Sequence, residues 1–223
     1  MLEIKNIYKT FNPGTINEKV ALNGLSLKLN EGDFVTVIGG NGAGKSTMLN
    51  AVAGVWPVDE GQIIIDGTDV TKLSEYKRAA YLGRVFQDPM TGTAATMGIE
   101  ENLALAKRRG KTRLLRPGIT KAERAEYKEL LKILNLGLED RLTSKVGLLS
   151  GGQRQALTLL MATLQKPKLL LLDEHTAALD PKTAAKVLDI TDKIVNRDHL
   201  TTLMITHNMK DAIAHGNLSL IHI

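Results

Sequence analysis

Hydrophobic and polar residues alternate along the first thirty positions of the chain. Leu2 and Ile4, and later Leu25, Leu27 and Leu29, lie two residues apart with other residue types between them. A period of two is typical of strands that bury one face, so this segment predicts half-buried antiparallel β-strands.

Short apolar runs come next, and each is long enough for one buried strand. They cover residues 34–38, 81–86, 169–172 and 201–205. Apolar residues three and four apart, the spacing of a helix, are clearest at 99–106, 121–136 and 153–164. Strands that alternate with helices predict an α/β fold built on a parallel sheet.

Between Asp88 and Gln165 the patterns are almost all helical. We therefore predict a helical subdomain, at about 88–165, inserted in one domain that spans residues 1–217. The last six residues, 218–223, equal the translation of a transposon adaptor used in sequencing libraries. We expect those six to be a non-native tail.

The basic residues are concentrated in one stretch. Six of the 29 Lys and Arg residues lie within 107–116, which has no acid, so the other 23 nearly balance the 24 Asp and Glu residues. A solvated loop is the favoured interpretation of such a run, ahead of contact with anionic lipid or a membrane partner, and nucleic acid comes last. The six are Lys107, Arg108, Arg109, Lys111, Arg113 and Arg116.

No apolar stretch approaches the roughly 20 residues that a membrane-spanning helix needs. The N-terminus lacks the pattern of a secretory signal, and the chain has no cysteine. We therefore expect a cytosolic protein that is not integral to a membrane.

A glycine-rich segment joins the run at 34–38 to the next helix, and it matches the phosphate-binding P-loop pattern Gly-x-x-x-x-Gly-Lys-Ser. In such a loop backbone N–H groups converge on phosphates, and the helix N-terminus adds its dipole. We expect Lys45 to reach the β- and γ-phosphates of a nucleotide and Ser46 to bind Mg²⁺. The predicted binding residues are Gly39, Gly40, Asn41, Gly42, Ala43, Gly44, Lys45, Ser46 and Thr47.

Two acids follow the apolar run at 169–172. Asp173 and Glu174 suit a pair in which one carboxylate faces a metal ion and the next polarises the attacking water. We assign Mg²⁺ to Asp173 and the role of general base to Glu174. Acids after a strand also serve as helix caps, so it is the P-loop that favours the catalytic interpretation.

The segment Leu149-Ser150-Gly151-Gly152-Gln153 predicts a second phosphate site at a helix N-terminus. It also resembles, residue for residue, the signature motif of the ABC ATPases, and the resemblance extends over residues 2–217. The resemblance implies a P-loop NTPase core with an antiparallel β subdomain and an inserted helical subdomain. It further implies a head-to-tail dimer, in which Ser150, Gly151, Gly152 and Gln153 face the ATP held by the partner's P-loop.

The resemblance also implies roles for residues outside these motifs. Gln87 resembles the Q-loop glutamine, which senses Mg²⁺ and the attacking water, and His207 resembles the switch histidine at the γ-phosphate. Asp180 is similar to the D-loop aspartate that couples the two active sites. Their structural alternatives are a histidine that merely follows a strand and an N-cap for a helix that begins near Pro181.

An aromatic residue near the N-terminus stacks on adenine in this family. Phe11 is the better placed candidate, and Tyr8 is the alternative. One departure concerns His175, which stands where the family commonly has proline after the catalytic glutamate. We expect this exchange to make the geometry of Glu174 less rigid.

The resemblance implies an ATPase subunit of an ABC transporter, with ATP and Mg²⁺ as ligands, at the cytoplasmic face of the cell membrane. Its partners would be a second ABC ATPase subunit, an integral membrane permease and a solute-binding protein, with no nucleic acid. The stretch 91–106 is similar to bacterial importer subunits, amino-acid importers among them.

Two other classes of protein share parts of this pattern. A soluble ABC ATPase of DNA repair or translation carries the same motifs, but this sequence lacks the long coiled coil, zinc cysteines or second cassette of such proteins. A binding module without turnover is disfavoured because every catalytic position is filled.

Overall fold

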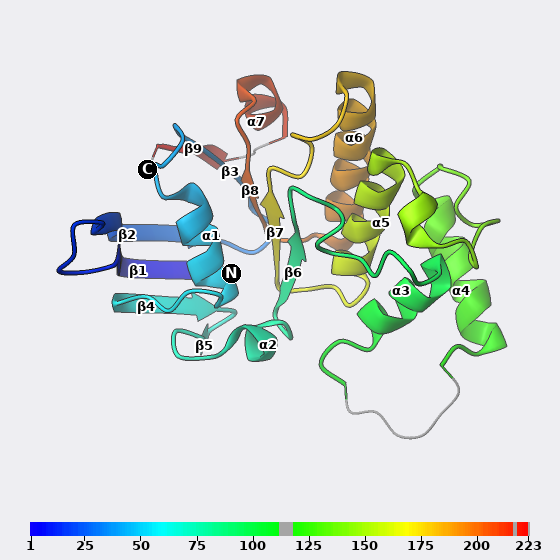
Figure 1. The fold of residues 1–223 in the computed structure, drawn as a ribbon, viewed down its shortest axis with the longest axis horizontal. Helices are drawn as coiled ribbons and strands as arrows, with labels where there is room; N and C mark the ends of the chain where they lie inside the picture. The colour runs from blue at the N-terminus through cyan, green and yellow to red at the C-terminus, as the bar shows by residue number, and fades with distance from the viewer. Residues whose placement is uncertain (112–117, 216–217, 223) are drawn as a thin grey trace. The chain divides into compact units, whose positions relative to one another are not determined.

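The computed structural model describes residues 1–111, 118–215 and 218–222, and Figure 1 follows the chain through its helices and strands. The chain divides into two compact units. The first contains residues 1–83, 167–173 and 199–223, and the second contains 84–166 and 174–198. The helical segment predicted at about 88–165 thus belongs to a unit that also takes in residues 174–198.

A four-stranded antiparallel sheet occupies the N-terminal part of the first unit, where Figure 1 shows its strands side by side. Its order is β2-β1-β4-β5, with β1 at Leu2–Phe11, β2 at Lys19–Leu29, β4 at Glu60–Ile65 and β5 at Thr68–Asp69. Leu2 pairs with Leu29 on one side and Ile65 on the other, and all three side chains are buried. The predicted alternation therefore describes one buried face of this sheet.

A second sheet, of five strands, has the order β6-β7-β8-β3-β9. The strands are β3 (Phe34–Ile38), β6 (Leu82–Val85), β7 (Leu169–Asp173), β8 (Thr202–Ile205) and β9 (Leu218–His222). Strands β7, β8, β3 and β9 pair in parallel, as the apolar runs predict for the first three. The predicted tail residues 218–222 form β9 here, and their non-native origin stays a prediction.

The described residues of the first unit form helices α1 (Lys45–Ala53), α2 (Glu75–Arg78) and α7 (Met209–His215). The sequence patterns predict the first of these but neither α2 nor α7. Helix α1 begins directly after the P-loop that leaves β3, so the strand and the helix fix both ends of this loop.

A buried arginine holds the C-terminal end of α1. Arg78 is 2% exposed, and its Nη1 donates to the carbonyl oxygens of Ala51 and Val52 at 2.6 and 2.9 Å. Its Nε and Nη2 donate to the carbonyl oxygens of Leu73 and Thr71, both at 2.9 Å. A cation at this end of a helix complements the helix dipole, so Arg78 stabilises the helix on which the P-loop rests.

The second unit is helical, and Figure 1 shows its helices grouped around α5. They are α3 (Ile99–Lys107), α4 (Lys121–Lys132), the 3₁₀ turn η1 (Val146–Leu148), α5 (Gly151–Thr163) and α6 (Pro181–Asp198). Helix α4 ends at Lys132 and is shorter than the predicted 121–136. Asn135 and Gly137 have φ of 50° and 67°, and left-handed residues of this kind terminate a helix.

Part of the basic stretch is neutralised inside the second unit. Lys107 forms an ion pair with Glu126, and Arg108 bonds to Glu123 at 2.8 Å, with both acids on α4. Arg113 and Arg116 lie outside the described residues. Lys107 ends α3, and the side chains of Lys107 and Arg108 are 29% and 22% exposed, so these two residues do not belong to a solvated loop.

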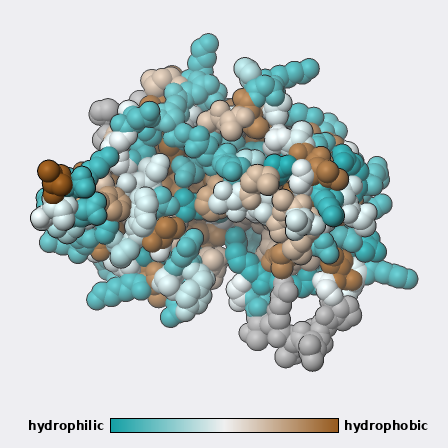
Figure 2. All heavy atoms as spheres, in the orientation of Figure 1, coloured by the Kyte–Doolittle hydropathy of each residue, from teal (hydrophilic) through white to brown (hydrophobic). Residues whose placement is uncertain are grey.

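Hydrophilic residues cover most of the face shown in Figure 2, and hydrophobic atoms appear there in small groups. Within residues 1–111 and 118–215 no helix is both long enough and apolar enough to span a bilayer.

Candidate nucleotide-binding site

Glycine determines the path of the P-loop. Gly42 and Gly44 have φ of 83° and 87°, in the left-handed region that side chains disfavour. A Cβ at Gly44 would also lie 2.4 Å from the carbonyl oxygen of Ala21 in β2. The loop therefore packs against the antiparallel sheet in a conformation that requires glycine.

Lys45 points back into the loop from the first turn of α1. Its Nζ donates to the carbonyl oxygens of Gly39 and Gly40 at 2.7 and 2.9 Å, and the residue is 5% exposed. Ser46 follows with an exposed side chain, and Thr47 is half-buried. A cation, backbone N–H groups and a helix N-terminus at one place are donors that suit the phosphate oxygens of a nucleotide.

Two further predicted residues reach the same edge of the parallel sheet. Asp173 ends β7 opposite Ile205 of β8, and Ile205 is in turn opposite Val37 of β3. The N–H of buried Thr206 donates to Val37 O at 3.2 Å, which ties the residue before exposed His207 to the strand that leads into the P-loop. The structure thus brings the P-loop, Asp173 and His207 to the carboxyl ends of neighbouring strands.

Glu174 begins a tight turn after β7. Its φ of 47° is left-handed, which costs a non-glycine residue about 1–2 kcal/mol. The next residue, His175, is buried at 2% exposure, and its Nε2 lies 3.2 Å from Thr191 Oγ1 on α6. Because the Thr191 hydroxyl donates to Val187 O at 2.9 Å, it accepts from His175. A packed, hydrogen-bonded histidine thus anchors this turn where the resemblance leads one to expect proline.

Of the two candidates for stacking on adenine, Phe11 is the one with a neighbour beside the P-loop. Its ring packs edge to face on Trp56 at 5.0 Å between centroids, whereas the Tyr8 hydroxyl lies 2.9 Å from where a Cβ of Gly24 would be. The register partner of Phe11 is Lys19, whose Nζ is 3.7 Å from the Cβ position of P-loop Gly42. Phe11 therefore lies on the strand pair that flanks the P-loop.

Lys19 and Trp56 were not among the predicted site residues. A cation beside the P-loop suits an anionic ligand, and Trp56 supports the Phe11 ring. No motif marks either residue. Their places depend on the β1–β2 register and on the turn after α1, and the sequence pattern gives neither.

The signature segment forms the N-terminus of α5. Ser150 is the N-cap: its Oγ accepts from Gln153 N–H at 3.3 Å, and Gln153 Oε1 accepts from Ser150 N–H at 3.1 Å. A Cβ at Gly152 would lie 2.1 Å from Thr183 Cγ2 on α6, so this glycine permits close helix packing. The motif therefore has a structural function as well as donors for a phosphate.

Asp180 caps α6, as its structural alternative proposes. Its Oδ1 accepts from Thr183 N–H at 3.1 Å, and these hydrogen bonds with Thr183 lower the pKa of the Asp180 carboxyl. Gln87 follows β6 with an exposed side chain in the second unit. The capping bond and the proposed coupling role of Asp180 are compatible.

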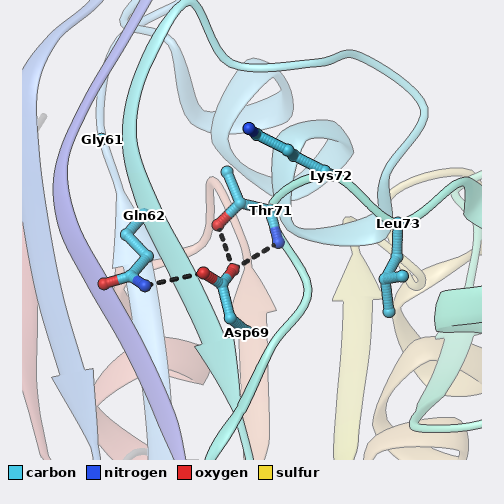
Figure 3. Close-up of a pocket in the computed structure, with 6 residues that line it drawn as sticks. All are labelled: Gly61, Gln62, Asp69, Thr71, Lys72 and Leu73. Carbon is cyan, nitrogen blue, oxygen red and sulfur yellow. Dashed lines mark hydrogen bonds between the residues drawn. The ribbon is translucent and has the colours of Figure 1, made fainter.

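An open cavity of about 470 Å³ lies along β4 and β5 and contains none of the predicted site residues. Figure 3 shows its lining, in which Asp69 accepts from Gln62 Nε2 at 2.7 Å and from the hydroxyl and N–H of Thr71 at 2.6 and 2.9 Å. These bonds lower the pKa of Asp69 to about 2. Three of the lining residues, Gln62, Asp69 and Thr71, bond to one another, which indicates a structural network.

A glycine-dictated loop between a parallel strand and a helix, with an acid at the end of a neighbouring strand, defines a P-loop nucleotide-binding protein. Residues 22–177 match the model of the ABC transporter family. The chain therefore belongs to the ATP-binding proteins of that family, which confirms the predicted ABC ATPase fold and ATP hydrolysis.

Similar proteins agree with this assignment. The tyrosine transport ATP-binding protein of Clostridioides difficile is 48% identical over 229 residues, covering 100% of this chain and 88% of the relative. The methionine import ATP-binding protein MetN of Rhizobium etli is 39% identical over 194 residues, covering 85% of this chain but 51% of the relative. The solved dimer of the cassette MJ0796, bound to ADP and Pi, has a TM-score of 0.83 at 31% identity, covering 100% of this chain and 94% of that one.

Proposed function

We propose that this ATPase acts as a head-to-tail dimer and drives a separate membrane permease from the cytoplasmic face of the membrane. The meeting of the P-loop, Asp173 and His207 at one sheet edge supports a hydrolytic site most directly. Ser150 and the N-terminus of α5 offer a second set of donors for a phosphate, which fits a signature that serves a second subunit. The dimeric form of the cassette MJ0796 favours the same arrangement.

In the proposed reaction, water attacks the γ-phosphorus in line with the bond to the bridging oxygen of ADP. Glu174 accepts a proton from this water, and the bridging bond breaks to give ADP and phosphate. Lys45 and the P-loop N–H groups stabilise the charge on the phosphate oxygens. His207 of the same chain and Ser150 of the second subunit each donate a hydrogen bond to the γ-phosphate.

The residues predicted to bind Mg²⁺ carry side chains that suit a divalent cation. Ser46 offers a hydroxyl, Asp173 a carboxylate and Gln87 an amide oxygen, which are the ligands that Mg²⁺ accepts beside phosphates and water. Mg²⁺ would supply neutralisation of phosphate charge. We propose these three residues as its protein ligands.

A mixing experiment tests the shared site. Lys45→Ala and Ser150→Ala chains should each lack turnover, because each loses one half of every site. In their heterodimer, one site combines the intact P-loop of one chain with the intact signature of the other. An equal mixture should therefore recover about a quarter of the wild-type rate, measured as phosphate release from Mg-ATP.

The matched control mixes Lys45→Ala with Glu174→Gln. Both changes affect the half-site that holds the phosphates, so neither site of the heterodimer is complete and the rate should stay at background. Recovery in both mixtures, or in neither while the wild type turns over ATP, would contradict the head-to-tail site.

We further propose an amino acid as the transported solute and a solute-binding protein as the third component. The names of the tyrosine and methionine transport relatives support this class. The test is uptake by vesicles that contain the chain with its permease. Tyrosine and methionine should compete with uptake of a labelled amino acid. Competition by a polyamine alone would argue for a different class of solute.

A further inference from the structure

The Q-loop segment, residues 87–98, runs from Gln87 to the start of α3. It is hydrogen-bonded directly to the residues that precede the signature. Val146 N–H donates to Met97 O at 3.0 Å, and Gly147 N–H donates to Ala95 O at 2.9 Å. Both contacts lie inside the second unit. The chain that follows Gln87 and the chain that leads to Ser150 therefore form one hydrogen-bonded assembly.

A close contact joins the same segment to the signature helix itself. At Gly92 a Cβ would lie 2.7 Å from Thr158 Cγ2 of α5. Thr158 is 3% exposed, and its hydroxyl donates to Arg154 O at 2.9 Å, which holds its methyl group toward the loop. This part of the Q-loop segment therefore rests against α5 with no room for a side chain.

Gln155 of α5 extends this attachment to Gln87. It is 0% exposed, and its Nε2 donates to the carbonyl oxygen of Phe86 at 3.0 Å. The carbonyl of Phe86 and the N–H of Gln87 belong to one planar peptide unit. A bond that fixes this oxygen therefore fixes the plane from which Gln87 departs.

The amide oxygen of Gln155 is less well satisfied than its nitrogen. Its Oε1 is buried and has no hydrogen-bond partner among the described residues. A buried amide with one end unpaired stabilises a helix less well than an apolar side chain of similar size. Stability alone therefore does not account for a glutamine at this position, whereas its bond to Phe86 does.

We propose that Gln155 is a positioning residue that couples the nucleotide sensed by Gln87 to the signature of the same chain. A displacement of the Gln87 peptide is passed through Gln155 to α5, and so to Ser150 at its N-terminus. Ser150 contacts the ATP of the second subunit. Nucleotide binding at one site therefore affects nucleotide binding at the other. This inference rests on the proposed roles of Gln87 and Ser150.

The test compares two steps in a Glu174→Gln background, which retains ATP. Gln155→Met fills the same space but cannot donate to Phe86. Fluorescent ATP analogue binding to dilute monomers should stay within about twofold of the parent, whereas ATP-driven dimerisation, measured by sedimentation, should weaken by about tenfold, a usual size for site-to-site coupling.

Thr163→Val is the matched control, because Thr163 is a buried polar residue of the same helix that bonds to Leu159 O and Leu160 O at 3.0 and 3.1 Å. It should alter unfolding by urea but not dimerisation. Gln155→Asn, whose shorter amide cannot reach Phe86 O, provides the same comparison if Gln155→Met does not fold.

Three results would overturn the proposal. Dimerisation of Gln155→Met equal to the parent would remove the coupling role, and equal losses in monomer binding and dimerisation would reduce it to a structural one. A Glu174→Gln parent that binds ATP but never dimerises would refute the shared site itself, and the coupling with it.

Discussion

Gly44 is a residue at which one added methyl group decides whether the P-loop forms. Gly44→Ala places a Cβ 2.4 Å from Ala21 O at a φ of 87°. We expect a loss of about 2–4 kcal/mol in the free energy of unfolding, from left-handed strain together with overpacking. Nucleotide binding should fall with it, and urea unfolding and binding of a fluorescent nucleotide measure the two effects.

Gly67→Ala separates strain from collision. Gly67 has a φ of 77°, but no heavy atom of the described residues lies within 4 Å of its Cβ position. We expect a loss of about 1–2 kcal/mol here, with nucleotide binding retained. If Gly44→Ala were no more harmful than Gly67→Ala, the close approach to Ala21 would be unimportant.

The carboxyl group of Asp69 makes the stability of the fold depend on pH. Its hydrogen bonds with Gln62 and Thr71 lower its pKa from 3.8 to about 2 in the folded chain. The folded state therefore favours the ionised carboxylate, and this contribution is complete above pH 4 and is lost as the pH falls toward 2. The midpoint of urea unfolding should be higher for the wild type than for Asp69→Asn at pH 5.

The gap between these two midpoints should narrow steadily between pH 4 and pH 2.5 (Figure 3). A gap that stays constant over this range would mean that the carboxylate charge has no part in the network around Thr71.

At the scale of elements, the N-cap of α5 has a structural and a catalytic function that substitutions can separate. Ser150→Ala removes the acceptor for Gln153 N–H, and we expect a loss of about 1 kcal/mol in stability. Ser150→Asn restores a capping oxygen and should regain that stability. Turnover of ATP should stay low in both variants, since neither offers a hydroxyl to the second subunit's nucleotide.

An activity that returned along with stability in Ser150→Asn would contradict the catalytic part of this prediction. Thermal unfolding and phosphate release, measured on the same preparations, distinguish the two functions.

The elements with strong apolar patterns are those that the sequence predicts. The run at 34–38 coincides with β3, because five apolar or small residues between turn residues leave little freedom in its bounds. The short elements β5 and α2 escape prediction, since two to four residues establish no period. The early end of α4 arises from Asn135 in a left-handed conformation, which its residue type merely permits.

In the candidate site, too, the sequence predicts some residues and misses others. Spacing alone places Lys45 in the P-loop, because the loop is a local structure between one strand and one helix. Tertiary contacts bring Lys19 to the P-loop and Gln155 to the peptide that precedes Gln87. Gln155 faces Phe86 from 69 residues away in the sequence, and no local pattern encodes such a pairing.

For the whole molecule, nucleotide should act as a stabiliser. A ligand at one hundred times its dissociation constant adds about 2.7 kcal/mol to the folded state, which corresponds to about 5–10 °C in the unfolding temperature of a chain this size. Mg-ATP should produce this shift in thermal unfolding of the wild type. Lys45→Ala should lose it, and a shift that survives this change would place the nucleotide elsewhere.

The hydrogen bonds from Arg78 to the backbone around α1 have an evolutionary consequence. All four oxygens that it binds are backbone carbonyls, so the residues that supply them are free to change without losing the contact. No substitution at another position creates a replacement guanidinium. Among homologous chains, position 78 should therefore stay arginine without any covarying partner, a pattern that methods based on correlated substitutions would overlook.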